Sequence, residues 1–270
     1  MRSAPGSRLN TVPGSRWRSV PLVAVPLLVV SVWEGVTRRQ ADVFFPPPSR
    51  IVARMHELWF SGPPARLFLT DAALADVLPS LARMAAGLAG ALAAGVLLGL
   101  ALGRSERLFA YLDPLLQFAR AIPPPTLVPV FVVLLRLGTP MQIVSIVAGA
   151  VWPILLNTAD GVRQVDPVQT STARVFGLSA TDRLTRIVLP SALPRIAAGL
   201  RLSLSLALIL MVFSELLPGT ANGIGFQLTD AQSRSDLPTV WAAVLLLGLL
   251  GYLLNLLLLT AERRLLRWHR

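Results

Sequence analysis

The stretch TVWAAVLLLGLLGYLLNLLLLT, residues 239–260, contains no charged side chain. About 20 apolar residues suffice for an α-helix to cross the hydrocarbon core of a membrane, which is about 30 Å thick. The apolar residues follow one another without the alternation of a membrane β-strand. Similar stretches occur at about residues 20–36, 82–103, 118–137, 141–159 and 196–217. The sequence therefore predicts an all-α membrane protein with about six transmembrane helices.

The composition agrees with a membrane protein. The 270-residue chain is 54% hydrophobic and only 14% charged, whereas soluble domains carry about 25% charged residues. The net charge of +11 comes from arginines at the ends of the apolar stretches. This placement is typical of a membrane surface with anionic lipids and disfavours nucleic-acid binding. The chain has no cysteine and two histidines, so no disulfide and no metal cluster is expected.

The basic residues are all arginines, and the chain has no lysine. The phosphate-binding P-loop requires a lysine that reaches the β- and γ-phosphates of ATP. We therefore expect that this chain does not hydrolyse ATP and is not itself an enzyme.

The apolar stretches and the charges between them divide the chain into segments. Arginines lie just before the first stretch and after the last one: Arg16, Arg18, Arg263, Arg264, Arg267 and Arg270. Because such residues mark cytoplasmic ends, both termini are predicted to be cytoplasmic, although Arg38 and Arg39 oppose this orientation. The predicted segments are a cytoplasmic tail (1–19), a first transmembrane helix (20–37), an extracytoplasmic segment (38–81), a core (82–260) and a basic cytoplasmic tail (261–270).

Small residues recur at every fourth position of the second stretch: Gly87, Ala91, Gly95, Gly99 and Gly103. On a helix they form one stripe against which another backbone can approach closely. The favoured interpretation is tight helix packing within one subunit. A subunit interface or a translocation pathway is the alternative.

Two other features are candidate elements of a pathway or gate. The third stretch is interrupted by Pro123, Pro125 and Pro129 among other prolines, and irregular backbone at membrane depth is tolerated only in a protein interior or along a wet cavity. Alternatively, the prolines mark the point where a helix enters the membrane. Glu215 lies late in the fifth stretch, where it is either an interfacial residue or the partner of an arginine in a gate or site.

A polar segment, residues 162–190, separates the fourth and fifth stretches and is longer than a simple connection requires. Its apolar residues recur at helical spacing and predict one apolar face: Val162, Val165, Val168, Thr172, Val175 and Phe176. Gly177 is suited to the left-handed residue that ends a helix, and Ser179 begins a predicted cap with Asp182. Leu189, Pro190 and Pro194 are expected to end a second short helix. We expect a partner to dock on this face; a helix lying on the inner leaflet is the alternative.

The same segment resembles a known family. Ala173-x₃-Gly177-x₉-Ile187-x-Leu189-Pro190 is similar to the EAA loop, E-A-A-x₃-G-x₉-I-x-L-P, of ABC-importer permeases. Ser171 stands where the family has glutamate, and Thr172 replaces the first alanine. In that family the loop enters a groove on the ATPase subunit. The resemblance assigns ATPase coupling to Ala173, Phe176, Gly177, Ile187, Leu189 and Pro190.

Further motifs resemble the nitrate/sulfonate/taurine branch of the family. They include Phe45-Pro46-Pro47-Pro48, Pro79-Ser80-Leu81-Ala82-Arg83 and Glu215 followed by Gly223-Ile224-Gly225. The resemblance implies a type I importer permease with the MetI-like fold in the inner membrane. It further implies two cytoplasmic ATPases that hold ATP and magnesium, an extracytoplasmic binding protein, and two permease subunits that move a small anion into the cell. A homodimer is the favoured arrangement, and a pair of different permeases is the alternative.

A secondary transporter or channel without an ATPase is the main alternative function. Ion coupling would require ionisable residues at mid-membrane, and the centres of the stretches at 82–103, 141–159 and 239–260 contain none. A membrane anchor without transport activity is the other alternative.

Overall fold

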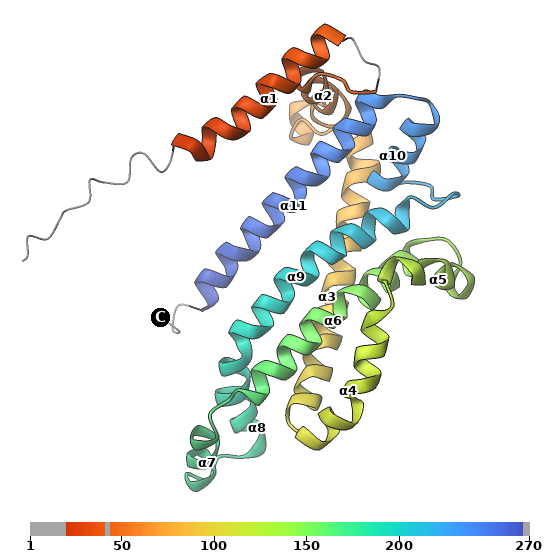
Figure 1. Ribbon diagram of the computed structural model, residues 1–270. Coiled ribbons are helices and arrows are strands. Elements are labelled where there is room, and N and C mark those ends of the chain that lie inside the picture. Colours follow the sequence, from red (N-terminus) through yellow and green to blue (C-terminus); the bar gives the residue numbers. More distant parts are fainter. Residues whose placement is uncertain (1–19, 41–43, 267–270) are drawn as a thin grey trace, which may run out of the picture.

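The computed structural model describes residues 20–40 and 44–266, and all the regular elements within them are helices (Figure 1). The predicted tail at 1–19 and residues 267–270 of the predicted C-terminal tail lie outside the described residues. The α-helices are α1 (Val20–Gln40), α2 (Pro48–Met55), α3 (Leu78–Gly103), α4 (Glu106–Ala121), α5 (Val128–Leu135), α6 (Thr139–Arg163), α7 (Pro167–Val175), α8 (Ala180–Arg183), α9 (Leu189–Glu215), α10 (Ile224–Ser233) and α11 (Leu237–Leu265).

Within the described residues, four helical runs are long and apolar enough to cross a membrane, and the bent pair of α4 and α5 raises the number to five. The four runs contain α3, α6, α9 and α11. The predicted first crossing forms α1 but is not among these runs; its last two turns carry Glu34, Arg38 and Arg39. The all-α membrane fold is thus confirmed, whereas the number of six crossings is not.

The bundle is built around α6, which packs along α3 and along α9. The stripe of small residues on α3 faces α6. A Cβ atom on Gly95 would lie 2.8 Å from the side chain of Ile154, and one on Gly99 would lie 2.5 Å from Thr158. The structure therefore confirms the favoured interpretation of the stripe, because glycine is what lets α3 and α6 come this close.

The predicted third stretch is part of a broken element. Residues 106–121 form α4, and the chain then turns by 81° into the helical piece at 124–135. The break is at Pro123, Pro124 and Pro125, which lack the N–H group that would continue α4. Pro124 packs against α6, where a Cβ on Gly149 would lie 2.8 Å from it. The prolines therefore join two helices at a bend, and the first of these begins well before the predicted residue 118.

The polar segment was predicted to contain a second short helix that ends at Pro190 and Pro194. This prediction is wrong, because the helix does not end there. The run from Ala180 to Glu215 is one continuous helical element of 36 residues, and Pro190 and Pro194 lie within it. A turn of π-helix at Leu184–Val188 immediately precedes Leu189-Pro190. Such a turn shifts the backbone hydrogen-bond ladder. The helix can therefore continue through Pro190, which has no N–H group to donate. A π-turn at Ala73–Val77 precedes Leu78-Pro79 in the same way, and α3 continues that run.

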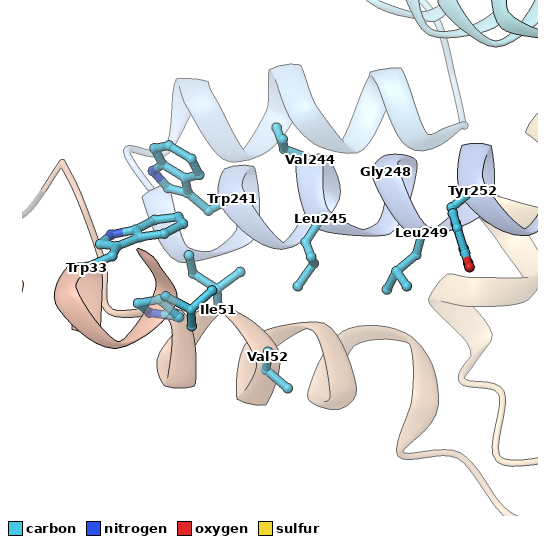
Figure 2. Close-up of a pocket in the computed structure, with 11 residues that line it drawn as sticks. Trp33, Ile51, Val52, Trp241, Val244, Leu245, Gly248, Leu249 and Tyr252 are labelled. Atoms are coloured by element: carbon cyan, nitrogen blue, oxygen red, sulfur yellow. The ribbon is translucent and has the colours of Figure 1, made fainter. Parts of the chain in front are cut away.

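α11 lies beside α2, and α2 in turn contacts α1. Arg54 of α2 donates hydrogen bonds to Asp236 and Thr239 at the start of α11, both at 2.9 Å. The rings of Trp33 and Trp241 meet nearly edge to face, with centroids 5.5 Å apart. Figure 2 shows the apolar groove of about 540 Å³ between these helices.

Candidate functional site

The two ends of the bundle carry different structures. We call the end with α7 and α8 the loop end, and the end with α10 the hairpin end (Figure 1). The continuous run 180–215 joins them, from α8 at the loop end to Glu215 beside α10.

At the loop end, α7 is closed by a defined turn. The N–H of Leu178 donates to the carbonyl oxygen of Ala173, and the N–H of Gly177 donates to that of Arg174, each at 3.0 Å. These two bonds form the Schellman motif that ends many helices. Gly177 has φ +73°, a left-handed conformation that costs glycine least. The predicted role of Gly177 at the end of this helix is confirmed.

Side-chain caps fix the start of each short helix. The Asp166 carboxylate accepts from the N–H of Val168 at 2.8 Å. The Ser179 hydroxyl accepts from the N–H of Asp182 at 3.1 Å and donates to the Asp182 carboxylate. The predicted cap at Ser179 is confirmed, although its second bond joins two side chains. The turn between α7 and α8 is therefore a rigid surface feature.

Apolar side chains lie on the surface of this turn. Val175 is 86% exposed and Phe176 is 78% exposed, which is costly in water unless another surface covers them. Beside them is an open hollow of about 470 Å³, which we call the apolar hollow. It is lined by Val168, Gln169, Thr172, Ala173, Phe176, Leu178, Arg186, Ile187 and Ser191.

The structure divides the predicted coupling residues into two groups. Phe176 and Gly177 are exposed, and Ile187 is half-buried in the wall of the apolar hollow. Ala173 is buried, Leu189 packs against the buried cluster of Val162, Ala192 and Ile196, and Pro190 is half-buried. The first group can meet a partner, and the second holds the segment together.

The predicted apolar face was too long. Val162 belongs to α6, not to α7, and is only 8% exposed. A turn at residues 164–166 separates the two helices, so the helical spacing does not continue across it. Of the valines of the predicted face, Val168 is therefore the first that is exposed.

At the hairpin end, Glu215 is fully buried in a polar cluster. The Ser80 hydroxyl lies 2.8 Å from both oxygens of its carboxylate and donates its one proton to them. The carboxylate also accepts from Nη1 of Arg83 at 2.9 Å and from the N–H of Gly225 at 3.1 Å. Arg83 also donates to the carbonyl and side-chain oxygens of Asn222. Of the two interpretations of Glu215, pairing with an arginine is therefore the one observed.

The cluster extends to Asp76, which the sequence did not single out. Its carboxylate accepts from the N–H of Gly223 at 2.9 Å and from the Gln227 amide at 2.5 Å. The approach is close, since a Cβ on Gly223 would lie 2.5 Å from the Glu215 carboxylate. The cluster thus ties the loop before α10 to α3 and α9. The signals in the sequence were the motif that contains Ser80 and Arg83 and the motif of Glu215 followed by Gly223-Ile224-Gly225.

The candidate pathway prolines do not share this cluster. Pro123 and Pro129 are exposed and Pro125 is half-buried, and they flank the bend between α4 and α5. No group of three or more metal-binding side chains occurs among the residues that the structure describes. The role of the prolines in a pathway stays a prediction.

Span-length helices, with a capped helix–turn–helix at one end and a buried ion cluster at the other, are typical of a multi-pass membrane protein. Residues 58–267 match the family of the binding-protein-dependent transport system inner membrane component. The chain belongs to this family.

Three relatives place it more closely. It is 37% identical to the bicarbonate transport system permease protein CmpB of Synechococcus elongatus, over 71% of this chain and 69% of that protein. It is 32% identical to the putative aliphatic sulfonates transport permease protein SsuC of Bacillus subtilis, over 90% and 86%. It is also 32% identical to the nitrate import permease protein NrtB of Leptolyngbya laminosa, over 95% and 91%. The predicted branch is therefore confirmed, with bicarbonate added to its anions.

The fold is also that of a solved transporter chain. A chain of the MetNI methionine ABC transporter, solved in inward-facing conformations, matches 70% of this chain and 94% of its own length with a TM-score of 0.59 and 18% identity. The MetI-like permease fold is confirmed, and the protein is an ABC importer permease of the nitrate, sulfonate, taurine and bicarbonate branch.

Proposed function

We propose that the chain imports a small anion of the size of nitrate, bicarbonate, taurine or an aliphatic sulfonate. An extracytoplasmic binding protein delivers the anion, and two copies of this chain form the pathway. Two ATPase subunits on the cytoplasmic side hold ATP and magnesium. The loop end and both termini lie in the cytoplasm. The anion class is supported by the transport functions named for the relatives.

One observation carries the assignment of the docking site. Phe176 is a large apolar side chain, 78% exposed, at the tip of a turn that is flanked by the Schellman motif of α7 and the Ser179 cap of α8. Ala173 and Ile187 line the hollow beside Phe176. Gly177 forms the turn that follows Phe176, and Leu189 and Pro190 follow Ile187 in the same helical run. We assign these residues to coupling with the ATPase.

The continuous helix provides a mechanical route for coupling. At 1.5 Å per residue, the 36-residue run from Ala180 to Glu215 is about 54 Å long. A displacement imposed on α8 can therefore reach the Glu215 cluster through one continuous helical run. In this mechanism, closure of the ATPases on ATP moves the loop end, and the cluster carries the motion to α3 and the loop before α10.

The docking assignment is tested with Phe176→Asp in the complex co-expressed with its ATPase. A charge on this side chain cannot be buried without a large cost, so we expect the ATPase to be lost on purification and ATP-driven anion uptake to be abolished. Thr181→Asp is the matched control, since Thr181 is exposed on the same segment but outside the apolar hollow. Undiminished recovery of the ATPase with the Phe176 variant would contradict the assignment.

The anion is tested by uptake of labelled nitrate, bicarbonate, taurine and an alkanesulfonate into proteoliposomes that contain the complex and its binding protein. We expect one of these four anions to be accumulated and accumulation to require ATP hydrolysis. Transport that continues with a non-hydrolysable ATP analogue would favour a secondary transporter.

A further inference from the structure

α7 separates two hollows of different character. Its residues at 168, 169, 172, 173 and 176 line the apolar hollow. Pro167, Thr170 and Arg174 line a second hollow of about 460 Å³, and their spacing of three and four residues places them on another face of the helix. A groove on a partner that receives α7 would therefore contact both the face beside the apolar hollow and the face beside the second hollow.

The second hollow, which we call the basic hollow, is rich in arginine. Arg104 comes from the end of α3, Arg163 from the end of α6, Arg174 from α7 and Arg183 from α8. Glu106 is the one acidic residue in its lining.

These arginines have a surplus of positive charge. Within the described residues, none of the four forms an ion pair with an acid. Arg163 instead lies over the ring of Phe109, 4.4 Å from its centroid. Because guanidinium groups pair preferentially with carboxylates or phosphates, the basic hollow is suited to bind anionic groups of an incoming surface.

We propose that the basic hollow binds carboxylate side chains of the ATPase subunit. This chain has Ser171 where the EAA pattern has glutamate, and Ser171 is exposed. The acids of the interface then belong to the partner and the cations to the permease. The inference rests on the proposed docking of α7 and adds the chemistry of the partner's groove.

The position of the basic hollow favours protein carboxylates over lipid phosphates. α6 has 25 residues and is about 37 Å long at 1.5 Å per residue, more than the hydrocarbon core of about 30 Å. α7 and α8 follow α6, so Arg174 and Arg183 lie beyond the end of a helix that already spans the core. The hollow also shares α7 with the exposed Phe176 surface, so one partner can cover both.

The absence of lysine allows a direct test. Carbodiimide activates a carboxylate, and an amine in contact displaces the activated group to form an amide, while the carbodiimide leaves as a urea. Arg174→Lys, in the complex co-expressed with its ATPase, keeps the positive charge and supplies one side-chain amine in the whole chain. We expect a covalent permease–ATPase product whose amide maps to an Asp or Glu of the ATPase.

Arg39→Lys is the matched control, because Arg39 lies at the end of α1 and the ATPase does not reach it in the proposed arrangement. The N-terminal amine is common to both variants and gives the background. No product above this background with Arg174→Lys would overturn the inference.

A second test uses Arg174→Glu with Arg183→Glu. Because unpaired charges in an interface weaken it strongly, we expect recovery of the ATPase to fall about tenfold or more. If recovery is unchanged while Phe176→Asp still detaches the ATPase, this inference fails and the proposed function stands. If the double variant lowers binding to anionic vesicles but not to the ATPase, lipid phosphate is the ligand and the inference is overturned.

Discussion

The buried pair of Arg83 and Glu215 gives the sharpest test of how the hairpin end is held. Their side chains are 10% and 0% exposed, so neither charge can be hydrated when its partner is removed. Glu215→Gln leaves the buried Arg83 guanidinium without a counter-charge, with only neutral oxygens as acceptors. Breaking a buried pair from one side costs about 3–5 kcal/mol, and we expect this loss for Glu215→Gln and for Arg83→Met.

The double variant should lose far less free energy of unfolding than the two single variants lose together. Arg83→Met with Glu215→Gln leaves no unpaired charge, and the new amide oxygen can still accept from Ser80 and from the N–H of Gly225. We expect a loss of about 1–2 kcal/mol, mainly from the hydrogen bonds to Asn222. The coupling energy of the cycle, the sum of the single losses minus the double loss, is then at least about 4 kcal/mol.

The assay is unfolding in mixed micelles by a denaturing detergent, followed by circular dichroism. Asp230→Asn is the control, since the pair of Asp230 with Arg234 is at the surface and its loss costs about 0–1 kcal/mol. Surface substitutions usually change the free energy of unfolding by less than about 0.5 kcal/mol. If both single variants stayed within this range of wild type, the reasoning would be refuted. A double variant whose loss equals the sum of the single losses would refute it as well.

Three further predictions follow from single residues. Gly177→Leu places a side chain at φ +73°, which costs about 1–2 kcal/mol. It should abolish ATP-driven uptake while the amount of protein in the membrane is retained. Normal uptake would contradict the docking role. Gly99→Leu should lower folded abundance by disrupting the contact of α3 with α6, whereas Gly248→Leu, with nothing within 4 Å, should not; equal effects would contradict the packing. Burial raises the pKa of Asp236, but the hydrogen bonds from Thr239 outweigh it and hold this pKa below 3.8. The stability from Asp236 is thus present at neutral pH and lost as the pH falls below about 3.8, which unfolding of Asp236→Asn against wild type across this range measures.

The sequence alone was enough for features that depend on local pattern. Continuous apolar runs predicted the crossing helices, and the stripe from Gly87 to Gly103 predicted close packing, because both are readable from one segment. Gly177 and Ser179 were likewise identified, since a helix end depends on the few residues around it.

Features that depend on a partner distant in the chain were missed. The partner of Glu215 is Arg83, 132 residues earlier, and no local pattern joins them. Pro190 was taken as a helix end because a proline usually breaks the ladder; the π-turn at Leu184–Val188 that absorbs it has no simple sequence signal. The basic hollow was not predicted because its arginines come from the ends of α3 and α6 and from α7 and α8.

The pair of Arg83 and Glu215 also has a consequence for biosynthesis. Arg83 is made 132 residues before Glu215, which at about 5–20 residues per second is an interval of about 7–26 s. During this interval α3 carries an arginine whose counter-charge does not yet exist, and a charged residue inside a span is costly to insert. α3 therefore depends on the insertion machinery until α9 arrives, and nascent chains that stop before Glu215 should be the ones that quality-control proteases remove.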